Sequence, residues 1–332
     1  MRAIYLILSI LIPFFSFAQE VKTDTISASC IQKDLSDVLR KMMNKPPKDT
    51  VDSKGGILLL PIIGSNPATG FMLGVGGQYA FKRSGEETRY SMISGSVQFT
   101  TKDQQLFLLK NNIYTKNNNI FLTGDWRYLI YSQSTYGLGT NAPQGGILDY
   151  QIGLAGQETS IDSLAQPLKF NFVRFHQSVS FRIKKSFYVG VGYFLDGFNH
   201  IEDERLRLTP GDSLITSHYA YSEYYGFDTN QYKSSAIGIN LVSDTRDNMI
   251  NPYKGHYAML SWNGSMEFLG SDKSADFFAF EWRSFHPLSK KNPRHLMALW
   301  AMANFTPEGE LPYLILPATA YDQRSRSGRG YS

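Results

Sequence analysis

The sequence predicts an all-β fold, a transmembrane antiparallel β-barrel. From Gly55 onward, large apolar residues alternate with small or polar ones, as in strands that face lipid on one side only. No later segment approaches the roughly 18 consecutive apolar residues of a membrane helix. The composition agrees, because 14% aromatic residues and 28 glycines accompany only 19% charged residues.

The chain begins with the pattern of an export signal, residues 1–18. Arg2 supplies the positive charge, an apolar stretch follows, and Ser16-Phe17-Ala18 is a small-x-small cleavage site. The apolar stretch is too short to span a bilayer, which argues against a membrane anchor. We expect residues 19–54 to form a periplasmic segment with a short amphipathic helix over 31–42 and a proline linker at Pro46-Pro47.

Period-two alternation predicts the barrel wall over residues 55–332. Phe187, Val189 and Val191, for example, alternate with Tyr188 and Gly190. About eleven segments read this way: 56–63, 70–83, 89–101, 104–115, 119–132, 168–182, 186–203, 232–246, 254–268, 274–289 and 294–306.

Loop length gives a second, independent indication. Connections after even-numbered segments are mostly tight, whereas three that follow odd-numbered segments are long: 133–167, 204–231 and everything past 306. Outer-membrane barrels have short periplasmic turns and long external loops. The alternative is a soluble β-sandwich, in which short and long connections are not expected to alternate between its two ends.

The number of expected strands, about eleven, indicates that the barrel is incomplete. An open sheet edge in lipid leaves unpaired backbone groups that cost several kcal/mol each, so membrane barrels close. We therefore expect these 332 residues to be a truncated part of a longer protein.

The sequence predicts neither an enzyme nor a cofactor or metal site. It contains no G-x-S-x-G, H-E-x-x-H or P-loop motif, its six histidines lack metal-ligand spacing, and Cys30 is its one cysteine. An embedded hydrolase assembled from distant strands is the open alternative. A net charge of +4 without a concentrated basic patch argues against a nucleic-acid partner.

One segment has the residue types of a tight periplasmic turn. Asp and Asn side chains bond nearby backbone groups, Pro fixes φ and Gly permits a tight return, and these residue types by themselves indicate a turn. The turn motif consists of Asp244, Arg246, Asp247, Asn248, Pro252 and Gly255.

A second segment, at the end of the chain, is rich in arginine and glycine. The aliphatic stretch before it, which includes Leu314 and Leu316, is too apolar for an exposed loop, so we expect the loop to fold into the barrel lumen. An ordinary surface loop is the alternative. The motif loop consists of Arg324, Arg326, Gly328, Arg329, Gly330 and Tyr331.

Together the two segments resemble the bacterial surface-antigen superfamily, the BamA–TamA type of outer-membrane assembly factor. Members carry a D-x-R-D-N…P-x-x-G turn, matched by Asp244 to Gly255, and a lumen loop with an R-G-F/Y motif, matched by Arg329-Gly330-Tyr331. The resemblance implies a sixteen-stranded barrel with the motif loop after strand eleven. Members usually carry POTRA domains before the barrel, and this chain shows none, which puts recognition of clients through such domains in doubt.

The resemblance implies insertion or translocation of proteins at the outer membrane of a Gram-negative bacterium. Lipid would be one partner and unfolded outer-membrane or secreted proteins the others, while periplasmic partners are not indicated. The candidate gate strand is the first one, with Ile57, Pro61 and Ile63, because proline removes a ladder donor and this edge should be weakly paired. A fraying first strand would explain the same residues. A passive channel or structural barrel that keeps the fold is the alternative.

Overall fold

The computed structural model describes residues 55–66, 69–83, 88–135, 165–210, 212–248, 251–289 and 295–316. The chain divides into two compact units, Met1–Asp52 and Ser53–Ser332, and only the second contains described residues. The predicted export signal (1–18), the predicted helix over 31–42 and the proline linker therefore lie outside the described part of the chain.

All eleven predicted wall segments are strands. Their ends lie within a few residues of the expected positions. The strands are β1 (Gly55–Asn66), β2 (Gly70–Lys82), β3 (Tyr90–Thr100), β4 (Gln105–Tyr114), β5 (Ile120–Thr135), β6 (Gln166–Lys184), β7 (Phe187–Asp203), β10 (Tyr232–Asp244), β11 (Gly255–Ser265), β12 (Ala275–Pro287) and β13 (Leu296–Gly309).

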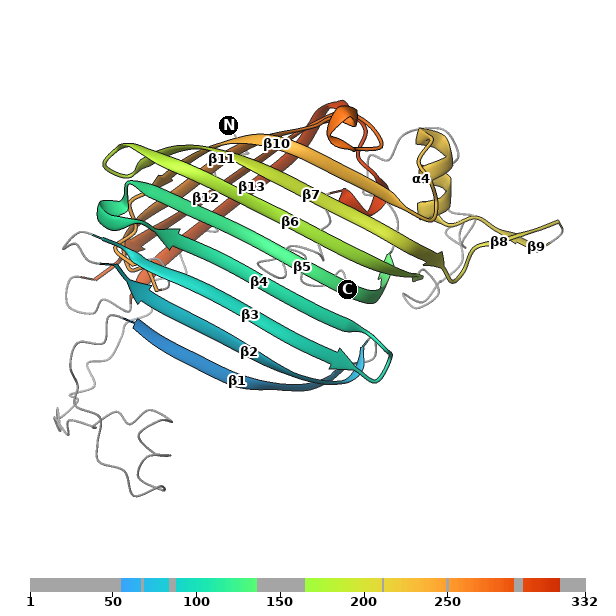
Figure 1. The fold of residues 1–332 in the computed structure, drawn as a ribbon, viewed down its shortest axis with the longest axis horizontal. Helices are drawn as coiled ribbons and strands as arrows, with labels where there is room; N and C mark the ends of the chain where they lie inside the picture. Colours follow the sequence, from blue (N-terminus) through green and yellow to red (C-terminus); the bar gives the residue numbers. More distant parts are fainter. Residues whose placement is uncertain are drawn as a thin grey trace, which may run out of the picture. The chain divides into compact units, whose positions relative to one another are not determined.

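These strands form one antiparallel sheet in chain order, from β1 at one edge to β13 at the other. Figure 1 shows the sheet curling, with β11 to β13 passing behind β5 to β7. The prediction of one continuous curved sheet, rather than two packed sheets, is confirmed. In the described residues β1 pairs only with β2 and β13 only with β12.

Pro61 does not shift the register of β1. The β1–β2 ladder runs from Gly55 to Asn66 without a register shift, and Pro61 lies opposite Val75. An edge strand has a neighbour on one side only, so alternate N–H groups face away from the ladder and proline is tolerated at such a position.

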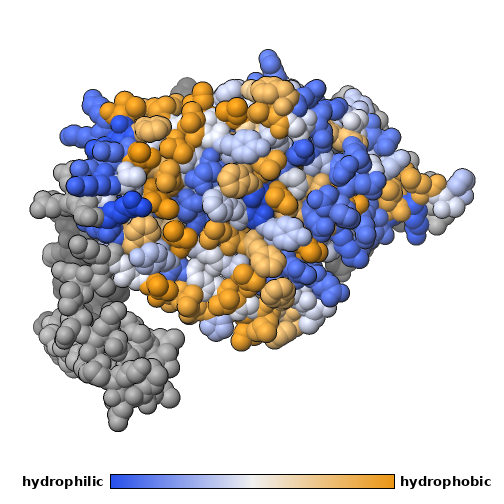
Figure 2. All heavy atoms as spheres, viewed as in Figure 1, coloured by the Kyte–Doolittle hydropathy of each residue, from blue (hydrophilic) through white to orange (hydrophobic). Residues whose placement is uncertain are grey.

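The register sorts side chains onto two different faces. One row of paired residues, from β6 across to β12, is apolar throughout: Val179, Val191, Ile239, Trp262 and Phe278. We call this the apolar face; on it Val191 is 57% exposed. Figure 2 shows apolar residues gathered between two hydrophilic ends of the molecule. The opposite, inner face carries small or polar residues such as Ser178, Gly192 and Asn240 along most of these strands.

The long connection between β7 and β10 contains elements that the sequence did not predict. It carries a small hairpin of β8 (Arg207–Thr209) and β9 (Asp212–Leu214), followed by the helix α4 (Ser217–Tyr225). Thr216 caps the start of α4 by accepting a hydrogen bond from the Tyr219 amide. Gly226 ends the helix in the left-handed conformation, with φ of 67°.

The residues after β13 fold onto the inner face. The 3-10 helix η3 (Tyr313–Ile315) and Leu316 pack into a cluster that contains Phe170 and Phe172 of β6 and Phe198 of β7. This cluster fills the inner side at the end of the sheet where α4 lies.

Candidate functional site

The predicted turn motif forms a compact turn between β10 and β11 around the Asp247 carboxylate. One oxygen of Asp247 accepts hydrogen bonds from the amides of Asn248 (3.0 Å), Tyr253 (3.0 Å) and Lys254 (3.3 Å). Burial opposes ionisation, but these backbone hydrogen bonds outweigh it and lower the pKa of Asp247. Pro252 lies within the same turn.

Gly255 closes this turn at a position that requires glycine. Its φ is +98°, a region that L side chains rarely adopt. A Cβ built there would lie 2.4 Å from the Thr245 carbonyl oxygen. The close backbone approach explains glycine at the start of β11.

Asp244, at the end of β10, is a buried carboxylate held by two arginines. Its side chain is 2% exposed. Arg246 binds both carboxylate oxygens at 3.0 Å, and Arg89 binds Oδ2 at 2.9 Å. The Tyr114 hydroxyl donates to the same oxygen at 3.4 Å. A carboxylate in this position is paired and hydrogen-bonded, as burial of a charge requires.

The pair between Arg89 and Asp244 crosses the inner side of the curved sheet. Arg89 directly precedes β3 and Asp244 ends β10, and four strands lie between them in the sheet order. Next to the pair, Tyr114 stacks on Phe121 with ring centroids 4.3 Å apart, and Tyr188 packs against both rings. We call Arg89, Asp244, Arg246 and the three rings the inner tie. It links the ends of β3, β4, β5, β7 and β10.

Sequence reasoning found Asp244 and Arg246 but missed the rest of the inner tie. Nothing in the local pattern marks Arg89, because its partner lies 155 residues away. The three aromatic residues of the inner tie, in contrast, could have been recognised from the sequence. Tyr114, Phe121 and Tyr188 are large side chains at strand ends, on the face where the alternation favours small or polar residues.

At the other end of the sheet, α4 holds the start of the segment that leads to the motif loop. The Tyr221 hydroxyl donates to the Leu311 carbonyl oxygen at 2.8 Å, and the Leu314 amide donates to the Tyr232 hydroxyl at 3.1 Å. Tyr313 is 6% exposed. The predicted motif residues Arg324, Arg326, Gly328, Arg329, Gly330 and Tyr331 lie outside the described residues.

His218 of α4 is buried in this contact beside the Asp203 carboxylate. Its ring lies against Tyr313 (5.5 Å) and Tyr232 (6.1 Å), and its Nδ1 is 3.9 Å from Asp203. Within the described residues its Nε2 has no hydrogen-bond partner. Burial lowers the pKa of His218 to about 4, so the ring is neutral at ordinary pH.

The candidate gate strand β1 is apolar on both faces. Ile57 and Ile63 point to the apolar face and are 72% and 67% exposed. The inward residues Leu58 and Leu60 are apolar as well. Strands with two apolar faces are typically covered on both sides. In the described residues only β2 pairs with it.

Ion pairs line the inner face midway along the sheet. Asp196 of β7 accepts from Arg174 (2.6 Å) and His176 (3.0 Å), and Asp125 of β5 pairs with Arg127 at 2.8 Å. The described residues hold no group of three or more His, Cys, Asp or Glu side chains that could bind a metal. The helices among them are all too short or too polar to cross a membrane.

Comparison with known proteins identifies the part of the chain that contains the turn motif. Residues 171–306, from β6 into β13, match the Omp85 superfamily domain. This part of the chain is an Omp85 superfamily domain. The resemblance to the surface-antigen family of BamA–TamA type, inferred from the two motifs, is confirmed. The Omp85 domain contains the whole turn from Asp244 to Gly255 and one arginine of the inner tie, Arg246.

Solved structures add a likeness that covers more of the chain. A crystal structure of BamA from Haemophilus ducreyi lacking POTRA domains 1–3 matches with a TM-score of 0.42 and 14% sequence identity. The match covers 81% of this chain and 45% of that one, so this chain spans less than half the length of that structure. No curated protein matches the sequence.

Proposed function

We propose that the protein is an outer-membrane β-barrel of a Gram-negative bacterium that inserts or translocates other proteins at that membrane. The Omp85 superfamily domain over residues 171–306 carries this proposal. Membrane lipid would contact the apolar face, and unfolded outer-membrane or secreted proteins would be the clients. The proposed role is non-catalytic and uses no cofactor.

The exposed edge of β1 supports a role in handling strands. Client strands are extended and apolar on one face, and they can add to a sheet edge through backbone hydrogen bonds. Among the described residues β1 pairs only with β2, and it carries apolar side chains on both faces at Ile57, Leu58 and Leu60.

A passive channel or structural barrel is the second candidate. The ion pairs of Asp196 with Arg174 and of Asp125 with Arg127 make part of the inner face polar. A polar inner wall is typical of water-filled barrels. This alternative keeps the same fold and membrane location but has no clients.

Depletion of the protein in its native host tests the two candidates. If it inserts other barrels, depletion lowers the amounts of folded outer-membrane barrels in isolated membranes, and the wild-type gene restores them. The control strain is depleted of an unrelated outer-membrane barrel. Unchanged barrel amounts, together with steady ion conductance of the purified protein in planar bilayers, would contradict the proposal and favour the channel.

A further inference from the structure

The end of the sheet opposite α4, where the short connections join the strands, carries exposed positive charge (Figure 1). Within the described residues none of these cations pairs with a carboxylate. The one exposed carboxylate described at this end, Asp247, already accepts hydrogen bonds from three backbone amides. We call the exposed cations the basic rim: Arg83, Lys116, Lys184, Lys185 and Lys254.

The short connections touch one another, so the basic rim is continuous. The Asn117 amide donates to the Thr88 hydroxyl at 3.1 Å, which joins the β4–β5 turn to the β2–β3 turn. The Arg182 guanidinium donates to the Asn119 side chain at 2.9 Å, which joins the β4–β5 turn to the end of β6. The β10–β11 turn follows next, because β10 pairs with β7.

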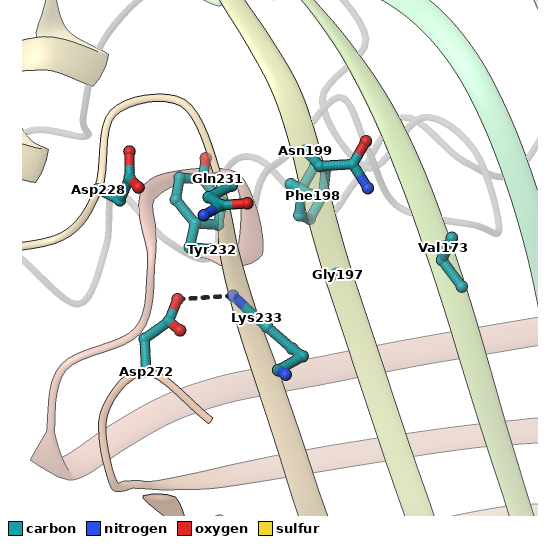
Figure 3. A pocket seen from close by; sticks show the side chains of 9 residues that line it. All are labelled: Val173, Gly197, Phe198, Asn199, Asp228, Gln231, Tyr232, Lys233 and Asp272. Atoms are coloured by element: carbon teal, nitrogen blue, oxygen red, sulfur yellow. Dashed lines mark hydrogen bonds between the residues drawn. The ribbon is translucent and has the colours of Figure 1, made fainter. Parts of the chain in front are cut away.

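The opposite end of the sheet has a different charge pattern. The long connection 133–167 contains three acidic residues and neither lysine nor arginine. In the pocket at the α4 end, Figure 3 shows the one lysine, Lys233, together with Asp228 and Asp272. Positive charge in excess is therefore a feature of one end and not of the surface as a whole.

The basic rim borders the apolar face directly. Phe181 and Phe187 lie on that face and are 50% and 39% exposed, and Ile183 is 65% exposed. Lys184 and Lys185 lie between these residues in the chain. A lysine at such a boundary keeps its stem along apolar surface and its ammonium group in the polar layer. A membrane offers hydrocarbon beside charged head groups, whereas an acidic soluble protein would match the charge alone.

We propose that the basic rim binds anionic phospholipids, whose head group carries a phosphate and no ammonium group. The proposal rests on the membrane placement in the proposed function, which turns the short connections towards the periplasm and so places the rim at the phospholipid leaflet on that side. Each lysine or arginine near an anionic membrane surface strengthens the association. The rim would thereby fix the depth of this end of the wall in the membrane.

Native mass spectrometry of the full chain tests the proposal, with phosphatidylglycerol and phosphatidylcholine of the same acyl chains added in equal amounts. We expect preferential retention of phosphatidylglycerol, because its head group has a net negative charge. Lys184→Gln together with Lys185→Gln should lower this preference about fivefold, the effect of one lysine near an anionic surface. Lys102→Gln together with Lys169→Gln is the matched control, since both lysines are exposed at the opposite end of the sheet.

Spin-labelled lipids in vesicles give a second measurement that depends on salt. The immobilised fraction of phosphatidylglycerol should exceed that of phosphatidylcholine at about 0.1 M salt. The two fractions should approach each other at about 1 M salt, where the screening length falls from about 10 Å to about 3 Å. A preference that persists at high salt would contradict binding through the charges of the rim.

Two further outcomes would overturn the proposal. Equal retention of the two lipids would mean that the rim binds no anionic lipid and leaves an acidic protein as its partner. Equal effects of the two double variants would show that net charge, and not the basic rim, sets the preference. Heat-modifiable gel migration reports membrane insertion separately. A wild-type chain that lacks it would contradict the proposed function, whereas an inserted chain without lipid preference would contradict only the role of the rim.

Discussion

Arg89 and Asp244 form a 2.9 Å ion pair although four strands of the sheet separate β3 from β10. Such a contact is possible only because the sheet curls and brings the inner sides of distant strands together. The pair therefore connects β3 and β10 directly across the inner side of the curved sheet. Its loss should affect the stability of the barrel wall rather than one strand alone.

Arg89→Ala should destabilise the folded barrel by about 1.5–3 kcal/mol, since it removes one charged hydrogen bond from the buried Asp244 carboxylate, which keeps Arg246. Unfolding by urea in detergent micelles measures the effect. Arg83→Ala is the control, because Arg83 is an exposed arginine near the same end of the sheet. Asp244→Asn together with Arg89→Ala should cost less than the sum of the single changes, and strict additivity would show that the two residues do not interact.

Gly255→Ala should destabilise the turn by about 1–3 kcal/mol, because alanine at a φ of +98° is strained and its Cβ would meet the Thr245 carbonyl. The same urea titration measures this cost. Gly56→Ala is the matched control, since a Cβ there meets nothing within 4 Å. If the two alanine variants unfold at the same urea concentration, the strained turn is not a feature of the folded protein.

Tyr221→Phe should loosen the segment after β13 by about 1 kcal/mol, the worth of its hydrogen bond to the Leu311 carbonyl. Hydrogen exchange should become faster for the amides of residues 311–316 and stay unchanged in β6 and β7. Tyr224→Phe serves as the control, because Tyr224 is 55% exposed. Equal exchange in both variants would mean that α4 does not hold this segment.

Acidification should weaken the contact between α4 and the segment after β13. The folded pKa of His218, about 4, lies below the ordinary value of 6.5, so the unfolded state binds the proton first. Stability is therefore complete above pH 6.5 and falls as the pH drops towards 4, by an amount on the order of 3 kcal/mol. Proteolysis within 204–231 should accelerate over this interval. His218→Gln should remove most of the pH dependence, and a wild-type rate that does not change with pH would contradict the buried neutral ring.

Arg329→Ala should lower the heat resistance of the folded full-length barrel. The resemblance places Arg329 in a lumen loop, where an arginine needs a carboxylate partner, and removal of one partner of a buried pair costs about 3–5 kcal/mol. Gel migration after heating measures the change, with Arg83→Ala as the exposed control. Equal heat resistance of both variants would place the loop outside the lumen.

The local chemistry of the sequence determined the strands, their faces and the turn. The alternation of Val189 and Val191 with Gly190 is a property of neighbouring residues, and so is the bonding of Asp247 to amides within seven positions. Both follow from backbone geometry that any extended chain or tight turn shares. The effect of Pro61 does not follow from neighbouring residues in this way, because tolerance of proline depends on which side of the strand has a neighbour.

Only the tertiary structure decided which distant residues meet. The pairing of Arg89 with Asp244, the hydrogen bond from Tyr221 to Leu311 and the position of Lys233 beside Gly197 and Asp272 all depend on the curl and register of the sheet. Curl and register arise from the sum of many strand pairings, and no single segment encodes them. The sequence pattern therefore determined the strands of this protein and their two faces. The tertiary structure determined which residues meet on the inner face and at the ends of the strands.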